Sequence, residues 1–198
     1  DHANKKYYKF STNLSGRHNL YNVTAAICVA IEENISVKDI AKGLAGFRGV
    51  GRRFELSEIY FSKHPHVLID DYGHHPAEIL STVLAAKEKF PRQKICMIFE
   101  PHRFTRTQQL FDDFKKVLSR VDFLLLLDIY PASEKPIKGI SSKKLASEIL
   151  EKNKNVYYIG KKDAMNWLHE NHQDFSILIT QGAGTISKLN KKIKKKWQ

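Results

Sequence analysis

Cysteine is scarce in this 198-residue sequence, which contains only two. Cys28 and Cys96 lie far apart, inside apparent structural elements, and show no spacing typical of metal ligands. Their number and placement exclude a fold built on disulfides and favour a reducing cytoplasm. We expect both thiols to be buried as small hydrophobic groups.

Long apolar runs are also absent. Runs such as residues 123–127 fall far below the roughly 18–20 residues that a transmembrane helix needs. The first six residues are polar, so we expect neither a secretory signal nor a membrane partner. The content of 42% hydrophobic and 27% charged residues is that of a globular protein.

Acidic residues are few, 21 against 33 lysines and arginines, and the formal net charge is +12. Half of this charge comes from the six lysines between residues 188 and 196. Apolar residues spaced by three and four run through the same segment: Ile186, Leu189, Ile193 and Trp197. This pattern predicts an amphipathic terminal helix with a basic face. That face is either simply solvated or attracts anionic substrates or nucleic acid.

Beyond residue 56, short apolar runs alternate with helical stretches. We expect strands at 67–69, 95–99, 123–129, 156–159 and 177–180, and helices at 76–90, 104–118, 142–150, 164–170 and from 186 onward. Five strand–helix repeats predict the α/β class, with a doubly wound, mostly parallel, Rossmann-like sheet. Residue 76 is a proline, which suits the first turn of a helix.

Polar clusters follow four of these strands directly, at residues 70–75, 100–103, 128–131 and 181–184. In doubly wound sheets, ligands bind outside the carboxyl ends of the strands. We therefore expect the four clusters to converge on one edge of the sheet and to form the functional site.

Residues 1–50 have a different pattern. We expect a strand at 7–10 and helices at about 19–32 and 37–44, which together provide too little core to stand alone. Glycines at 46, 49 and 51 indicate a hinge. This segment is expected to dock on its own chain, to pair with a second copy in a homodimer, or to remain mobile.

Residues 70–76 place two adjacent carboxylates and two adjacent imidazoles between a strand and a helix. A polar turn with capping residues is one explanation. A single metal site is disfavoured, because neighbouring residues of an extended segment point in opposite directions. A nucleotide and substrate site fits better, because a helix N-terminus offers free N–H groups to anions.

Three further clusters carry chemistry. Arg103 and Arg106 lie three residues apart and could grip a carboxylate or phosphate, or be ordinary surface arginines. Asn19 and Asn22 could read an adenine edge or cap a helix. Arg53 follows the glycine hinge, from which it could reach a phosphate and neutralise charge during phosphoryl transfer.

Taken in order, these clusters resemble the Mur ligases of cell-wall synthesis. Residues 70–76 (Asp-Asp-Tyr-Gly-His-His-Pro) and 101–106 (Pro-His-Arg-Phe-Thr-Arg) look like the branch that adds L-alanine to UDP-N-acetylmuramate. The likeness runs from about residue 14 to about residue 189. Murein-peptide ligases of cell-wall recycling share a similar first segment, but are not expected to carry the second. A basic nucleic-acid-binding module is a further alternative.

The resemblance implies a division at residue 51. Residues 1–51 would be the end of the central, ATP-binding domain, and 52–198 the C-terminal domain. It implies ATP-binding residues His18, Asn19, Asn22, Arg53 and Asp71. It implies substrate-binding residues Tyr72, His74, His75, Arg103 and Arg106, with Arg53 and His74 catalytic.

The resemblance also implies partners and a reaction. ATP and Mg²⁺ would convert the muramoyl carboxylate of UDP-N-acetylmuramate to an acyl phosphate, which the amine of L-alanine attacks in the cytoplasm. The sequence contains no Gly-x-x-x-x-Gly-Lys-Ser/Thr motif, so the magnesium ligands are expected in the central domain, with none in this chain. The N-terminal UDP-sugar domain is missing as well, and we expect the chain alone to be inactive. No specific nucleic acid is expected.

Two residues depart from the family pattern. Glu100 stands where the resemblance leads us to expect Gln, and Thr185 stands where Asp or Asn is usual. These departures affect local detail at two strand ends.

Overall fold

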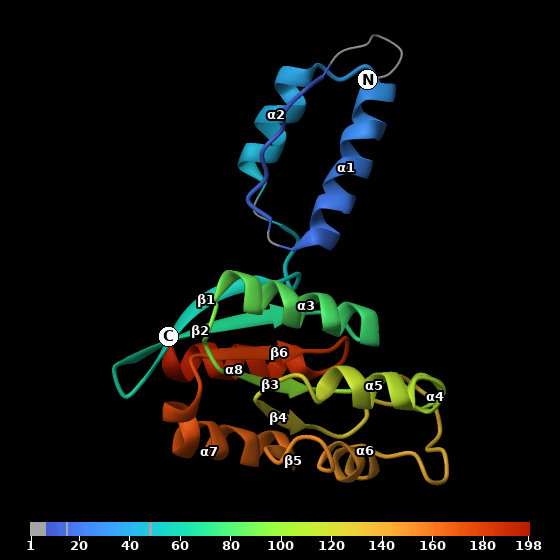
Figure 1. The fold of residues 1–198 in the computed structure, drawn as a ribbon, viewed down its shortest axis with the longest axis vertical. Coiled ribbons are helices and arrows are strands. Elements are labelled where there is room, and N and C mark those ends of the chain that lie inside the picture. The colour runs from blue at the N-terminus through green and yellow to red at the C-terminus, as the bar shows by residue number, and fades with distance from the viewer. Residues whose placement is uncertain (1–6, 15, 48) are drawn as a thin grey trace. The chain divides into compact units, whose positions relative to one another are not determined.

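The computed structural model describes residues 7–14, 16–47 and 49–198, apart from the side chain of His18. The chain divides into two compact units, Asp1–Val50 and Gly51–Gln198. Figure 1 shows the sheet of the second unit and the helix pair of the first.

The second unit is built on a six-stranded sheet with the order β1-β2-β6-β3-β4-β5. Its strands are β1 (Glu55–Phe61), β2 (His64–Asp71), β3 (Ile95–Phe99), β4 (Phe123–Leu126), β5 (Val156–Tyr158) and β6 (Ile177–Gln181). Every pair is parallel except the antiparallel pair β1–β2. The predicted fold class, a doubly wound and mostly parallel α/β sheet, is confirmed.

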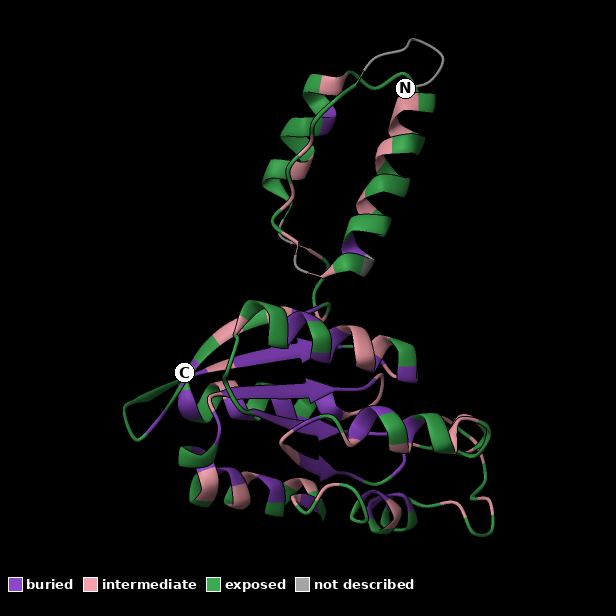
Figure 2. Ribbon diagram, viewed as in Figure 1, coloured by how far each residue is buried: buried purple, intermediate pink, exposed green. Residues whose placement is uncertain are grey.

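Helices cover both faces of this sheet (Figure 1). They are α3 (Pro76–Lys89), α4 (Phe104–Gln109), α5 (Phe111–Leu118), α6 (Ser142–Ile149), α7 (Lys161–Asn171) and α8 (Ile186–Trp197), and a short 3-10 helix spans His172–Asp174. Side chains of α3, α5 and α6 pack on one face, and those of α7 and α8 on the other. Figure 2 shows that the central strands β6, β3 and β4 are almost wholly buried, which explains why they read as continuous apolar runs.

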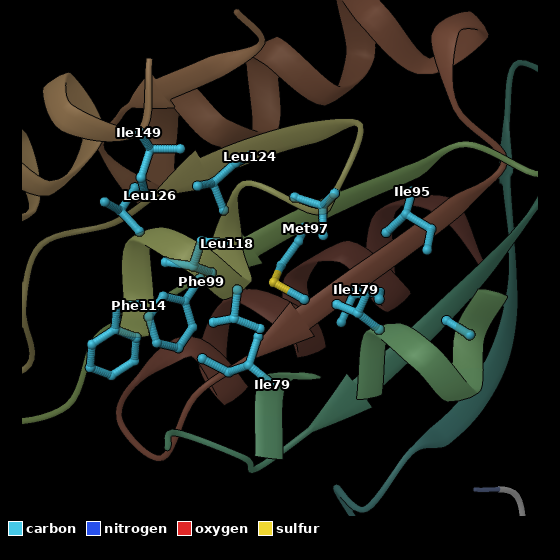
Figure 3. Packing of buried hydrophobic residues seen from close by; sticks show 14 of the residues in the cluster. Ile79, Ile95, Met97, Phe99, Phe114, Leu118, Leu124, Leu126, Ile149 and Ile179 are labelled. Carbon is cyan, nitrogen blue, oxygen red and sulfur yellow. The ribbon is translucent and has the colours of Figure 1, made fainter. Parts of the chain in front are cut away.

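The first of these cores is close-packed around the central strands (Figure 3). Met97 and Phe99 of β3 are fully buried, and the ring of Phe99 lies 5.7 Å from that of Phe114 on α5. Burying one such side chain stabilises the fold by about 1.5–3 kcal/mol. This layer fixes the strand ends from which the polar loops emerge.

The hairpin that joins β1 to β2 was not predicted. Its two central residues, Ser62 and Lys63, have φ angles of 47° and 72°. A two-residue hairpin turn needs such left-handed geometry, which sequence reasoning recognises by Asn-Gly or Asp-Gly. Because Ser-Lys carries no such signal, β1 escaped prediction and β2 was predicted too short.

The single helix predicted at 104–118 is wrong. Leu110, with φ −114° and ψ 26°, separates α4 from α5. The hydrogen bonds Leu110 N to Arg106 O and Phe114 N to Leu110 O continue across the break. The spacing of apolar residues therefore does not reveal it.

The first unit contains α1 (Arg17–Glu32) and α2 (Val37–Gly46). The strand expected at residues 7–10 is not formed, because the described part of this unit offers only helices and no strand edge to pair with. Cys96 is buried as expected. Cys28 is exposed on α1, so the prediction that it is buried is wrong.

Candidate active site

The strand order brings the four polar loops to one edge of the sheet. The carboxyl ends of β2, β6, β3 and β4 are consecutive in the sheet. Beyond β3 and β4, a parallel bridge joins His102 to Tyr130. The loop after β6 also meets the others, since the Gly182 amide donates to the carbonyl oxygen of Asp71 over 3.1 Å. The predicted convergence is therefore observed.

Asp71, at the end of β2, organises this edge. Its carboxylate is buried and accepts hydrogen bonds from the Phe54 amide at 2.8 Å, the Gly73 amide at 2.7 Å and Gln181 Nε2 at 3.1 Å. A Cβ at position 73 would lie 2.6 Å from Gln181 Nε2, so this position needs glycine. These bonds tie the loops before β1, after β2 and at the end of β6. A role of Asp71 toward a nucleotide stays a prediction.

The two adjacent arginines before β1 have different surroundings. Arg52 is held from two sides: its Nε lies 3.3 Å from Oδ2 of Asp70, and its Nη2 donates to the carbonyl oxygen of Gly182 over 2.6 Å. Burial raises the pKa of Asp70, and the Arg52 charge works against this shift. Arg53 is exposed, with its guanidinium carbon 5.7 Å from the ring centroid of Tyr72. Arg53 is therefore the arginine presented at the surface.

The start of α3 does not offer the free N–H groups that we expected. Glu78 Oε2 accepts from the amides of His74 and His75, at 2.8 and 2.9 Å. His75 Nδ1 in turn accepts from the Ala77 amide at 3.2 Å, which completes a capping box. Burial opposes ionisation of Glu78, but the two backbone hydrogen bonds dominate and lower its pKa. The expectation of free N–H groups at this helix start is wrong, because the chain caps it with its own side chains.

A row of aromatic rings crosses the strand ends. The ring of Tyr72 meets that of His74 edge-on at 5.4 Å, and the ring of His74 lies 5.4 Å from that of His102. His102 stacks on Tyr130, with centroids 5.5 Å apart and planes at 25°. These ring contacts join the loops that follow β2, β3 and β4.

The surroundings of His102 favour its neutral form. Burial lowers its pKa, and the nearby His74, Arg106 and Arg103 lower it further. Arg106 Nη1 lies 3.3 Å from His102 Nδ1. Because a guanidinium can only donate, Nδ1 must accept, and the imidazole proton resides on Nε2.

Arg103 and Arg106 both lie close enough to this imidazole for their charges to lower its pKa. Arg103 is exposed and precedes α4 with a left-handed φ of 74°. Arg106 is half-buried, and its Nη1 also donates to the carbonyl oxygen of His102 over 3.3 Å. Two guanidiniums beside a neutral imidazole form a cationic surface suited to a carboxylate.

Glu100, the residue directly after β3, is a second buried carboxylate. Its Oε1 lies 2.5 Å from Lys161 Nζ and accepts from the Thr185 hydroxyl at 2.8 Å. Its Oε2 accepts from the Ile186 amide at 2.8 Å, which starts α8. Glu100 and Thr185, the two departures from the expected pattern, are therefore hydrogen-bonded to each other. Lys161 supplies the charge that balances the carboxylate.

The sequence matches the profile described as "Mur ligase, glutamate ligase domain" over residues 52–184. The chain belongs to this family.

Solved structures of Mur ligases and related ligases share the fold. A UDP-N-acetylmuramate–alanine ligase from Thermotoga maritima matches with TM-score 0.72 and 26% identity, over 97% of this chain and 40% of that one. A murein peptide ligase from Psychrobacter arcticus gives 0.67 and 20%, over 94% and 38%. A folylpolyglutamate synthase from Mycobacterium tuberculosis, solved with ADP and AMPPCP, gives 0.65 and 13%, over 94% and 42%. This chain spans about two fifths of the length of these relatives.

The structure brings some of the predicted site residues together and leaves others apart. Tyr72, His74, Arg103 and Arg106 come together around His102, as described above. Asn19 is buried and Asn22 is exposed in α1, in the first unit. The side chain of His18 lies outside the described residues. The ATP-binding assignments in this unit stay predictions.

Sequence reasoning missed several residues of this edge. His102 could have been found, because it belongs to the same six-residue segment as Arg103 and Arg106. Arg52 and Lys161 carried no such signal: the first is one of two adjacent arginines, and the second is one of many lysines. Only their tertiary contacts, to Asp70 and Glu100, distinguish them.

Neither a metal centre nor a membrane span is found in the described part of this chain. Across residues 7–14, 16–47 and 49–198, no three His, Cys, Asp or Glu side chains are grouped to hold a metal ion. Within the same ranges, no helix combines the length and apolarity needed to cross a bilayer.

Proposed function

We propose that this chain is the C-terminal portion of a UDP-N-acetylmuramate–L-alanine ligase. This cytoplasmic enzyme would use ATP to join L-alanine to UDP-N-acetylmuramate in peptidoglycan precursor synthesis, and so serve cell shape and division. The observation that carries the proposal is the pair Arg103 and Arg106 beside the neutral imidazole of His102.

The arginine pair would hold the carboxylate of the amino acid. Two guanidiniums can make several charge-assisted hydrogen bonds to one carboxylate. The ring row of Tyr72, His74 and His102 would lie beside the rest of the substrate. Fixing the carboxylate in this way orients the amine for attack on an activated carbonyl.

His74 is suited to take a proton from the attacking amine. Its Nδ1 lies 3.2 Å from the carbonyl oxygen of Tyr72, which can only accept, so Nδ1 carries the proton. In the neutral ring, Nε2 would then carry the lone pair that accepts the proton. General base catalysis by a positioned imidazole contributes typically 10²–10⁴-fold to a rate. His75, which caps α3, would act by shaping this loop.

The nucleotide side of the reaction would involve other residues. ATP supplies the phosphoryl group that activates the muramoyl carboxylate. The exposed guanidinium of Arg53 is available to the phosphates, and Asp71 would support the loop that carries Tyr72 and His74. His18, Asn19 and Asn22 are proposed for the adenine side. The Mg²⁺ ligands are expected in the central domain, of which residues 1–51 would be the last part.

Two alternatives remain as outcomes of the test. A murein-peptide ligase would share the loop at residues 70–76, and the relative from Psychrobacter arcticus has the same fold. The family description instead names a glutamate ligase domain. We favour L-alanine because residues 101–106 resemble the alanine-adding branch.

The test is steady-state kinetics of the complete gene product that contains this chain, with L-alanine, L-glutamate or a murein peptide as the acceptor. L-alanine should give the highest kcat/KM. Arg103→Ala and Arg106→Ala should each raise the KM for L-alanine roughly ten- to a hundredfold, as expected for a lost charge-assisted hydrogen bond. The control is Arg120→Ala, beyond the end of α5. A preference for another acceptor, or variants that alter only the KM for ATP, would contradict the proposal.

A further inference from the structure

The loop after β4 is joined to the segment that carries the arginine pair. The Tyr130 amide donates to the carbonyl oxygen of Pro101 over 2.8 Å, and the Arg103 amide donates to the carbonyl oxygen of Tyr130 over 2.9 Å. These bonds extend the pairing of β3 and β4 past the strand ends. They stop at Arg103, one residue before α4 begins.

A side-chain clamp takes over where these backbone bonds end. The Thr105 amide donates to Glu134 Oε2 over 3.0 Å, and the Thr105 hydroxyl donates to Oε1 over 2.6 Å. Both carboxylate oxygens are thus engaged by one residue, which lies between Arg103 and Arg106. The hydroxyl and then the amide lower the pKa of Glu134, so the charged form is favoured. We call this contact the Thr105–Glu134 clamp.

The clamp also supplies what α4 lacks in its own sequence. The N-cap residue of this six-residue helix is Arg103, which makes no side-chain capping hydrogen bond. The Thr105 amide is one of the first N–H groups of the helix, which have no partner within it. Glu134 satisfies this group from a different loop and thereby couples that loop to the helix.

Strained backbone lies on both sides of the clamp. Arg103 has a φ of 74°, and Ala132 and Ser133, just before Glu134, have φ angles of 47° and 72°. Residues other than glycine rarely adopt this left-handed backbone conformation. It persists only where surrounding contacts enforce it, and such strain clusters at functional sites. The clamp joins the two strained segments by side-chain hydrogen bonds.

We propose that Glu134 is a positioning residue of the carboxylate site. By holding Thr105 from the opposite loop, it maintains the left-handed backbone of Arg103, so that the guanidiniums of Arg103 and Arg106 serve the same substrate carboxylate. This inference rests on the proposed function. It assigns to Glu134 no contact with the substrate.

The test compares two pairs of variants in the complete gene product. Glu134→Ala removes both acceptor oxygens, and Glu134→Gln keeps one. Thr105→Val removes the hydroxyl donor, and Thr105→Ser keeps both donors. The matched control is Glu148→Ala, which removes a carboxylate paired with Lys115 between α5 and α6.

Glu134→Ala should raise the KM for the amino acid about tenfold and leave the KM for ATP within about twofold, since only the carboxylate grip is loosened. Glu134→Gln and Thr105→Val should give smaller increases, while Thr105→Ser and Glu148→Ala should behave as wild type. Equal increases in both KM values would indicate a general loss of structure and overturn the proposal. The proposal would also be overturned if Glu134→Ala left the KM for the amino acid unchanged while Arg103→Ala raised it.

If Arg103→Ala does not change the KM for any of the acceptors, the proposed function fails. A second measurement then still tests the clamp. Amide hydrogen exchange of the 198-residue chain reports on the clamp directly. Glu134→Ala should speed exchange at Thr105 and Arg103 at least tenfold, while the amides of β3 stay protected. Unchanged protection at Arg103 would show that Glu134 does not hold it.

Discussion

The ammonium group of Lys161 lies 2.5 Å from Oε1 of Glu100, whose side chain is only 3% exposed. Lys161 begins α7 and Glu100 directly follows β3, so the ion pair joins two parts of the fold that are distant in sequence. Close by, a Cβ at position 184 would lie 2.5 Å from Glu100 Oε2 and 2.7 Å from Tyr130 Cγ. The pair therefore supports the loop after β6 and, through it, Tyr130.

Removing Lys161 should be costly because it leaves a buried carboxylate without its counter-charge. We expect Lys161→Met to lower the free energy of unfolding by about 1.5–3 kcal/mol. The double variant Glu100→Gln/Lys161→Met should recover most of this loss, because a neutral amide needs no counter-charge. The exposed Lys162→Met is the control. Urea unfolding followed by the fluorescence of Trp167 and Trp197 measures all of them, and a double variant no better than the single one would contradict the compensation.

Glu78 should make the stability depend on pH. Its pKa is lowered in the folded state from an ordinary value of 4.5. The ionised cap therefore stabilises the fold above pH 4.5, and this contribution is lost as the pH falls through the lower folded value. At pH 7, Glu78→Gln should cost about 1 kcal/mol, because the amide keeps an acceptor oxygen but loses the charge that strengthens both hydrogen bonds.

The difference between wild type and Glu78→Gln should shrink below pH 4.5. Thermal unfolding of both proteins between pH 7 and pH 3 gives this difference directly. Other carboxylates with a lowered pKa, such as Glu55 and Glu134, are present in both proteins. Their contributions to the pH dependence therefore cancel in the difference. A difference that stays constant over the whole range would show that ionisation of Glu78 does not support α3.

The first unit should be far less protected than the second. Among its described residues only Asn19 and Ile40 are buried, so its helices have little core to resist opening. Amide exchange in α1 should be much faster than in β4 of a dilute monomer. Equal protection would mean that residues 1–50 form one cooperative unit with the remainder.

The basic face of α8 should bind polyanions weakly and without specificity. Truncation is a poor test, because Ile193 and Trp197 are buried. Replacing the exposed Lys191, Lys192 and Lys195 by Gln removes charge and keeps the core. Any DNA binding by wild type should have a Kd of about 10⁻⁴–10⁻⁶ M, weaken steeply with salt and largely disappear in the triple variant. Tight binding that resists salt would instead indicate a nucleic-acid-binding function.

The sequence by itself determined the elements whose signals are local. Apolar runs identified the buried parallel strands, because a strand covered on both faces needs apolar side chains on both. Pro76 marked the start of α3, and polar residues marked where strands end. Local signals failed where the geometry was unusual: Ser62 and Lys63 form a hairpin turn without glycine or asparagine, and Leu110 breaks a helix without interrupting its apolar pattern.

Tertiary structure alone decided which side chains act together. The sheet places β6, the last strand in the sequence, between β2 and β3, and this order determines which loops meet. It fixes Arg52 to Asp70 and Gly182 while Arg53 stays exposed, and it pairs Lys161 with Glu100. Sequence periodicity carries no information about such contacts, because it reports how a segment is buried and not which distant segment lies against it.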